Sequence, residues 1–152
     1  MPKEKQQNSF EEVLSKLMRY CAYQERSELE VRQRALELGA TESNCDRLLK
    51  ELKKEKFIEN RRFAELYLRG KVNQKRWGKF KIIEGLRKKG ISQADIDYAF
   101  SQMDHMVYEN NLKQLIEKKI EGQEMNSAFK AKVFRYLTSK GYESSLVLEF
   151  LN

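Results

Sequence analysis

Positive charge gathers in one stretch of the chain, between Arg69 and Gly90, where Glu84 is the only acidic residue. The nine basic residues there are Arg69, Lys71, Lys75, Arg76, Lys79, Lys81, Arg87, Lys88 and Lys89. Uncompensated charge of this density repels itself unless a partner neutralises it. This stretch, called the basic block below, therefore predicts contact with an acidic protein surface or with the phosphates of a nucleic acid.

Trp77 lies inside the basic block and adds a second kind of binding chemistry. An exposed tryptophan beside lysine and arginine can stack on a base or anchor a protein contact. The alternative is that Trp77 is a core residue and that the charges cover a solvated helix face. Trp77 and Gly78 fall where a loop is expected to lead into a helix. We take Trp77 as a candidate binding residue together with the nine cations.

Chemistry other than binding has little support in the sequence. Cys21 and Cys45 are far apart, and His105 is the only histidine, so a zinc site has no set of ligands. Cys45 is expected to be a small core residue rather than a reactive thiol. The chain contains no glycine-rich phosphate loop and no nucleophile elbow. We expect no catalytic residue, no metal site and no cofactor, and therefore no enzyme.

The composition favours amphipathic helices over a sheet. Pro2 is the only proline, 40% of the residues are hydrophobic and 35% are charged. The net charge of +7 agrees with an acidic partner. No apolar run approaches the ~20 residues that cross a bilayer, and Met1 to Ser9 lack the apolar segment of a secretory signal. We expect a cytoplasmic protein without a membrane partner.

Three glycines divide the chain at a regular interval, because Gly39, Gly90 and Gly141 are 51 residues apart. Apolar residues keep the same register before and after each glycine. The equivalent sets are Val31, Ile82 and Val133; Ala35, Leu86 and Leu137; and Cys45, Ile96 and Val147. A match of this kind, without gaps, indicates a tandem repeat.

Each of the three glycines is expected to end one helix and begin a corner into the next. Around Gly90, the apolar stripe of the preceding helix stops, and glycine can adopt the left-handed conformation that closes a helix. Ser92 then provides a side-chain oxygen for the N-cap of the following helix, as Thr41 does in the first corner. The third corner has Glu143 at this position, and its neighbour Ser144 is the candidate cap.

Other polar residues predict further helix starts. Ser27 and Glu30 have the spacing of a capping box, so a helix is expected to begin after Ser27. Asn60 and Asn126 are candidate caps for later helices.

These elements predict an all-α fold of three tandem three-helix repeats of about 51 residues. The expected division is a polar tail over residues 1–8, followed by repeats over residues 9–58, 59–103 and 104–152. A three-helix unit of ~50 residues buries too little surface to be stable alone. Stacking the units buries their remaining apolar faces and yields an elongated array, straight or curved. A single globular bundle is the alternative.

Four segments of the sequence resemble the RecX family, whose members regulate the RecA recombinase. They are Arg26 to Arg32, Phe57 to Ala64, Gly78 to Ile91, and Tyr136 to Tyr142. In the second segment Arg62 and Phe63 fit the family pattern, whereas Ile58, Glu59 and Asn60 replace the usual leucine and two aspartates. Gly85 and Leu86 stand where the family has glutamate and leucine. The order and spacing of the segments cover nearly the whole chain.

The resemblance implies a non-enzymatic regulator that binds RecA filaments on DNA and inhibits filament extension, ATP hydrolysis and strand exchange. Such proteins lie in the helical groove of the filament, and a row of helical units can contact several protomers at once. On this hypothesis a monomer presents the basic block and Trp77 to the acidic filament surface or to DNA phosphates. The corner glycines Gly39, Gly90 and Gly141 are then structural.

Two other functions remain open from the sequence. The first is direct binding of single- or double-stranded DNA through its phosphates, without sequence reading, because the helix after Gly90 carries no basic residue between Gln93 and Met103. The second is a helical scaffold for an unrelated protein partner.

Overall fold

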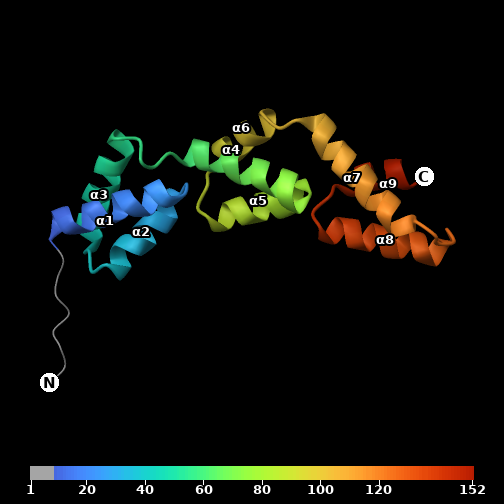
Figure 1. Ribbon diagram of the computed structural model, residues 1–152, viewed down its shortest axis with the longest axis horizontal. Helices are drawn as coiled ribbons and strands as arrows, with labels where there is room; N and C mark the ends of the chain where they lie inside the picture. Colours follow the sequence, from blue (N-terminus) through green and yellow to red (C-terminus); the bar gives the residue numbers. More distant parts are fainter. Residues whose placement is uncertain (1–8) are drawn as a thin grey trace, which may run out of the picture. The chain divides into compact units, whose positions relative to one another are not determined.

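The computed structural model describes residues 9–152, and this part of the chain folds into helices and turns without a β-strand (Figure 1). The all-α fold class predicted from the sequence is confirmed. The helices are α1 (Phe10–Tyr23), α2 (Glu28–Glu37), α3 (Glu42–Lys54), α4 (Asn60–Gly70), the π-helical turn η1 (Lys71–Lys75), α5 (Lys79–Lys88), α6 (Gln93–Ser101), α7 (His105–Ile120), α8 (Ser127–Ser139) and α9 (Ser144–Leu151). The predicted polar tail, residues 1–8, lies outside the described residues.

Polar side chains cap several helices as the sequence predicts. The capping box of α2 is complete, since the Ser27 side chain accepts from the Glu30 backbone and the Glu30 carboxylate accepts from the Ser27 backbone. Thr41, Ser92 and Asn126 cap α3, α6 and α8 in the same manner, by accepting a backbone N–H of the first turn. The prediction that Asn60 caps the helix that follows it is wrong, because Asn60 is the first residue of α4 and its side-chain oxygen accepts instead from the Glu28 N–H at the start of α2, at 2.9 Å.

The prediction that Ser144 caps the last helix is wrong. Ser144 is the first residue of α9, and the N-cap position belongs to Glu143, which makes no capping hydrogen bond through its side chain. The Glu143 carboxylate accepts instead from the hydroxyl of Tyr108. A tertiary contact has therefore taken the place of a local cap.

The three corner glycines adopt the left-handed backbone conformation predicted for them. The φ angles are 92° at Gly39, 76° at Gly90 and 100° at Gly141. The next residue is Ala40, Ile91 or Tyr142 in turn, and Ile91 and Tyr142 are buried. This is the arrangement of a helix C-terminus closed by a glycine and a following apolar contact.

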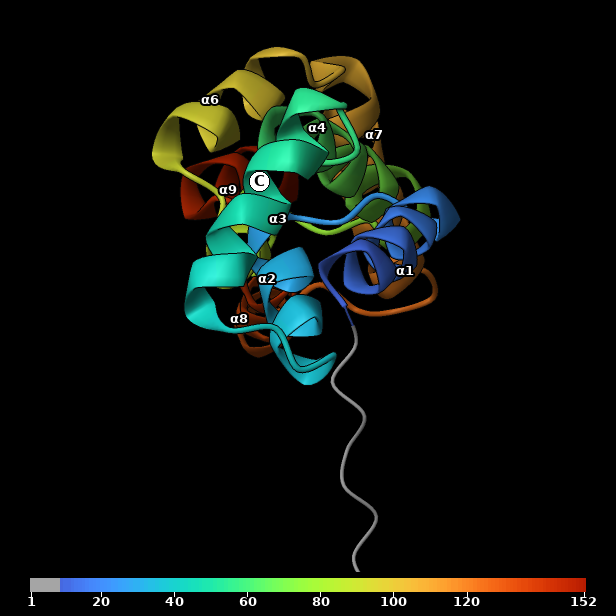
Figure 2. The ribbon, with the colours of Figure 1, turned by 90° about the vertical axis from the view of Figure 1, so that its left-hand side faces the viewer.

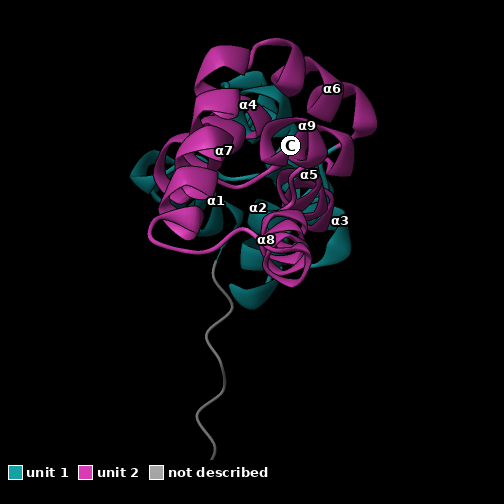
Figure 3. Ribbon diagram, turned by 90° about the vertical axis from the view of Figure 1, so that its right-hand side faces the viewer, with its two compact units in different colours: residues 1–63, 89–91 teal, residues 64–88, 92–152 magenta. Residues whose placement is uncertain are grey.

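The described chain divides into two compact units, shown in different colours in Figure 3. The first unit comprises residues up to 63 together with residues 89–91. Its helices α1, α2 and α3 contact one another in pairs (Figures 1 and 2). The core between them is built from Val13, Leu17, Cys21, Val31, Ala35, Cys45, Leu48, Leu49, Leu52 and Ile58.

The second unit comprises residues 64–88 and 92–152. Here α7, α8 and α9 contact one another, and η1 packs on α7. Ile82, Ile96, Val133 and Val147 are buried in this unit, as their repeat equivalents Val31 and Cys45 are in the first. The division into three repeats at 58/59 and 103/104 and their stacking into an array stay predictions. Within residues 9–152, no helix has the length and hydrophobicity that crossing a bilayer requires.

Candidate interaction surface

The basic block begins where the regular α-helix α4 gives way to a wider, π-helical turn. α4 runs into η1, a five-residue π-helical segment, and Arg76 then takes a left-handed conformation with φ of 53°. Its neighbour Trp77 donates its N–H to the carbonyl of Lys71 at 3.1 Å. A non-glycine residue in this conformation costs about 1–2 kcal/mol, and π-helical segments are rare. Other contacts must therefore hold this turn in place.

Those contacts come from the corner at Gly141, within the same compact unit. The Gly78 N–H donates to the Lys140 carbonyl at 2.8 Å, and the Phe80 N–H donates to the Gly141 carbonyl at 2.9 Å. The Tyr142 hydroxyl donates to the Arg76 carbonyl at 2.8 Å. Residues 76–80 are thus held in place by groups of Lys140, Gly141 and Tyr142, which lie more than sixty positions later in the chain. These contacts are called the clasp below.

Two side chains of α7 complete the clasp. The Tyr108 hydroxyl accepts the Lys79 N–H at 2.9 Å and donates to the Glu143 carboxylate. Asn111 donates its side-chain N–H to the carbonyl of Val72 in η1 at 2.8 Å. Burial raises the pKa of both Tyr108 and Tyr142 above the ordinary value of 10.0, and at Tyr108 the hydrogen bond to Glu143 acts in the same direction.

The clasp also determines how the start of α5 can bind a ligand. The backbone N–H groups of Lys79 and Phe80 are already bonded to Tyr108 and Gly141. They are therefore unavailable to the phosphate or carboxylate that a helix N-terminus often binds. Contacts of Lys79 and Phe80 with an anion must therefore be made by their side chains.

Most of the cations in the block lack an acidic partner. Lys88 pairs with Glu84 at 3.2 Å, and Lys89, which belongs to the first compact unit, pairs with Glu30 at 3.4 Å. Within residues 9–152, no carboxylate lies within 4.0 Å of the remaining seven, which are Arg69, Lys71, Lys75, Arg76, Lys79, Lys81 and Arg87. The side chains of Arg69, Lys75, Arg76, Lys79 and Arg87 are exposed. The second unit thus carries positive charge that its own acids do not neutralise.

Trp77 is half-buried, so it is neither the free stacking platform nor the core residue considered from the sequence. The ammonium groups of Lys71 and Lys81 each lie 4.6 Å from the centre of its ring. Cation–π contacts of this kind are worth about 0.5–1 kcal/mol at exposed sites. Trp77 therefore positions two cations of the block, and these two are correspondingly less free to reach a partner.

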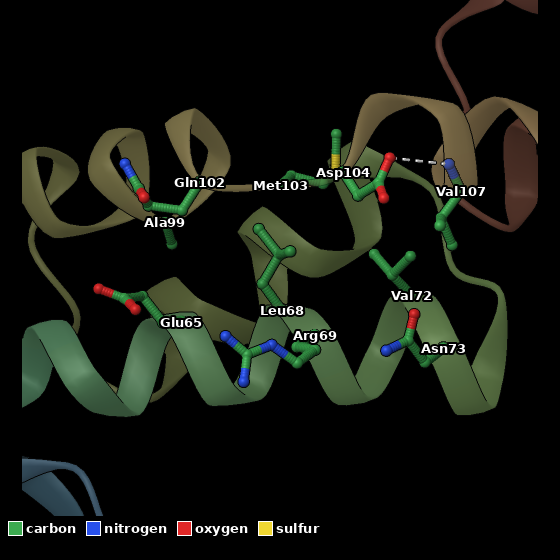
Figure 4. A pocket seen from close by; sticks show the side chains of 10 residues that line it. All are labelled: Glu65, Leu68, Arg69, Val72, Asn73, Ala99, Gln102, Met103, Asp104 and Val107. Atoms are coloured by element: carbon green, nitrogen blue, oxygen red, sulfur yellow. Dashed lines mark hydrogen bonds between the residues drawn. The ribbon is translucent and has the colours of Figure 1, made fainter.

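A pocket of about 220 Å³ lies beside Arg69 (Figure 4). Its walls come from α4, η1, the end of α6 and the start of α7, all in the second unit. Leu68, Val72 and Met103 provide apolar walls, and Glu65 and Arg69 provide charges of opposite sign. The sequence did not predict this pocket, because its lining residues extend from Glu65 to Val107 and share no local motif.

Phe80 lies between Lys79 and Lys81 but is not among the site residues that the sequence predicts. The structure exposes 59% of this side chain. Its position among cations was the available signal, but an apolar residue in a helix is more often part of the core.

Comparison with known proteins agrees with the resemblance seen in the sequence. The family domain described as "RecX, second three-helix domain" matches residues 60–99. A protein named "Regulatory protein RecX" from Haemophilus influenzae (strain PittEE) is 31% identical over 123 residues, which cover 79% of this chain and 80% of that relative. The chain belongs to the RecX family. The expectation drawn from the four sequence segments is thereby confirmed.

Other RecX relatives are longer than this chain. The "Regulatory protein RecX" of Oceanobacillus iheyensis is 26% identical over 144 residues, which are 93% of this chain and 53% of the relative. The chain thus spans about half the length of such relatives. It also resembles a solved structure titled "Crystal structure of regulatory protein RecX", with a TM-score of 0.84 and 28% identity over 93% of this chain and 72% of the other. RecX from Lactobacillus salivarius has the same fold, with a TM-score of 0.86 and 21% identity over 93% and 94% of the two chains.

Proposed function

We propose that this chain is a non-enzymatic regulator that binds RecA filaments assembled on DNA and inhibits their extension, ATP hydrolysis and strand exchange. The proposal rests first on membership of the RecX family, whose relatives are named regulatory proteins. It rests second on the seven cations of the basic block that have no carboxylate partner among residues 9–152. Charge of this kind favours an acidic partner surface. The regulator acts in the cytoplasm as a monomer, without a cofactor.

The exposed cations at the turn before α5 are the groups that bind the filament in this proposal. Lys75, Arg76 and Lys79 lie close together in sequence and are exposed. The clasp holds the backbone of Arg76 and Lys79 in one conformation. Binding then loses less conformational entropy than it would with a flexible loop.

The test is the DNA-dependent ATPase of RecA with this protein added at substoichiometric amounts. We expect the wild-type protein to lower the rate, and the variant Lys75→Glu, Arg76→Glu, Lys79→Glu to have little effect. Binding of the variant to the filament should also depend less on salt, because fewer ionic contacts remain to be screened. Lys81 is left unchanged because its ammonium contacts Trp77.

A matched control places the same change of charge in the first compact unit. Lys16, Lys50 and Lys54 are exposed, and substituting all three by Glu lowers the net charge equally. The control should inhibit RecA like the wild type. The proposal is wrong if the wild-type protein leaves the ATPase unchanged, or if both triple variants lose inhibition to the same extent.

The same cations favour a second candidate function, which is binding of DNA phosphates without sequence reading. Such binding falls steeply as salt rises, because it releases counterions from the DNA. A gel shift on naked DNA at two salt concentrations separates the two functions. Strong binding to naked DNA, with no further gain when RecA coats it, favours DNA binding as the activity.

A further inference from the structure

Phe80 is the large apolar side chain that the basic block exposes. It lies in the first turn of α5, and 59% of its surface is accessible. Helical spacing places Ile83, Glu84 and Arg87 on the same face, while Ile82 and Leu86 point into the core. Full burial of a phenylalanine side chain is worth about 1.5–3 kcal/mol, and more than half of the Phe80 surface stays exposed to solvent in the folded chain. Within the second unit, Phe80 is therefore available for a partner.

We propose that Phe80 is the apolar anchor through which the basic block docks on an acidic protein surface that has an apolar depression. This inference rests on the proposed function and adds the kind of contact that the partner makes. Protein interfaces commonly concentrate binding energy in a few aromatic anchors that enter pockets on the partner, surrounded by polar and charged residues. Phe80 with Arg76, Lys79 and Arg87 has this composition.

A protein partner suits the surroundings of Phe80 better than a nucleic acid does. Ile83 extends the apolar spot with an aliphatic group, which fills a pocket but has no aromatic face for a base. Trp77, which would stack more strongly, is already in contact with the ammonium groups of Lys71 and Lys81.

The backbone around the anchor is held before any partner arrives. The Phe80 N–H donates to Gly141, and the flanking Lys79 N–H donates to Tyr108. The Gly78 N–H donates to Lys140. An anchor on a fixed backbone is more effective than one on a mobile loop, because less freedom is lost on binding.

The test compares Phe80→Ala and Phe80→Leu with the control Met106→Ala, which removes another apolar side chain of the second unit that is 83% exposed. Affinity is measured for RecA filaments on single-stranded DNA with a non-hydrolysable nucleotide, and separately for naked single-stranded DNA. We expect Phe80→Ala to weaken filament binding by about tenfold or more, as a truncated anchor does. Phe80→Leu should keep most of the affinity, and Met106→Ala all of it.

Three further readouts separate an anchor from other roles. The salt dependence of filament binding should be unchanged in Phe80→Ala, because no charge is removed. Binding to naked DNA and the midpoint of thermal unfolding should also be unchanged. Equal weakening on naked DNA would show base stacking and overturn the inference.

Different experimental results would contradict the anchor and the proposed function. If Phe80→Ala binds the filament like the wild type while the charge-reversed triple variant does not, the anchor is wrong and the proposed function stands. If neither change affects filament binding, the anchor and the assignment of filament binding to the exposed cations are both wrong.

Discussion

The corners at Gly39 and Gly141 have the same local conformation but different surroundings. Both glycines have strongly positive φ, 92° and 100°. In both corners the residue after the glycine donates its N–H back to the last helical turn, from Ala40 to Ala35 at 3.0 Å and from Tyr142 to Leu137 at 3.2 Å. A Cβ added at Gly39 would meet no atom within 4 Å, whereas one at Gly141 would lie 2.5 Å from the backbone nitrogen of Lys81.

The difference shows that one repeated sequence position carries two physical requirements. At Gly39 glycine is needed for its backbone conformation alone. At Gly141 it is needed for conformation and for close approach, because the corner there lies directly against Gly78 and Lys81 at the start of α5. Gly78 has the reciprocal role, since its added Cβ would lie 2.2 Å from the backbone nitrogen of Tyr142.

Substituting Gly141 should have the largest effect. We expect Gly141→Ala to lower the free energy of unfolding by about 3 kcal/mol or more, because the strain of a positive φ adds to a clash with backbone atoms that cannot turn away. Urea unfolding followed by circular dichroism measures the loss. A variant that is unfolded without urea agrees with this expectation, provided that Gly39→Ala folds. If Gly141→Ala lowers the free energy of unfolding no more than Gly39→Ala does, the close approach at Gly141 does not contribute to stability.

Alkaline pH should destabilise the corner at Gly141 but not the corner at Gly39. Burial raises the pKa of Tyr142 above its ordinary value of 10.0, so the folded protein keeps the hydroxyl protonated after the unfolded chain has lost its proton. This contribution to stability is fully present below pH 10 and is lost as the pH rises above it. Ala40 stands at the equivalent position of the first corner and cannot ionise.

Between pH 9 and pH 11, wild-type protein should therefore lose more stability than Tyr142→Phe. The expected difference is about 1.4 kcal/mol at one pH unit above the ordinary tyrosine pKa. Unfolding in urea at each pH measures it for both proteins, and Cys21, whose pKa burial also raises, contributes equally to both. Parallel losses in the two proteins would mean that the Tyr142 hydroxyl ionises as readily in the folded state as in the unfolded one.

The features that the sequence predicts well are those that depend on neighbouring residues. The left-handed glycines, the capping box at Ser27 and the cap at Asn126 each follow from the chemistry of a few adjacent positions. The burial of Val31, Ile82 and Val133 follows from the helical period. The basic block is predicted equally well, because finding it requires only a count of the charged residues in the sequence.

What the sequence could not predict depends on groups brought together from distant parts of the chain. Nothing near Gly78 indicates that Lys140 and Tyr142 will clasp it, because more than sixty residues separate them. The failed cap at Ser144 has the same origin, since Glu143 is bonded to Tyr108. The environment of Trp77 also depends on packing, which sets its two lysine contacts.

The smallest expected effects concern the left-handed residues Gly39 and Lys56 of the first compact unit. Gly39→Ala should lower the free energy of unfolding by about 1–2 kcal/mol, which is the cost of a Cβ in the left-handed conformation. Lys56 gives the reverse case in the same compact unit, because it closes α3 with φ of 61° and its N–H bonds back to the helix. Lys56→Gly should raise the free energy of unfolding by about 0.5 kcal/mol, since relief of strain exceeds the added freedom of the unfolded chain.

Both substitutions are measured by urea unfolding against Gly141→Ala. Lys56→Gly keeps the backbone carbonyl that accepts a hydrogen bond from Arg62 at 3.1 Å, so only the conformational cost changes. A loss at Gly39 as large as that at Gly141 would mean that backbone conformation dominates both corners. A loss of stability in Lys56→Gly would mean that the unfolded chain, rather than left-handed strain, decides which residue can close these helices.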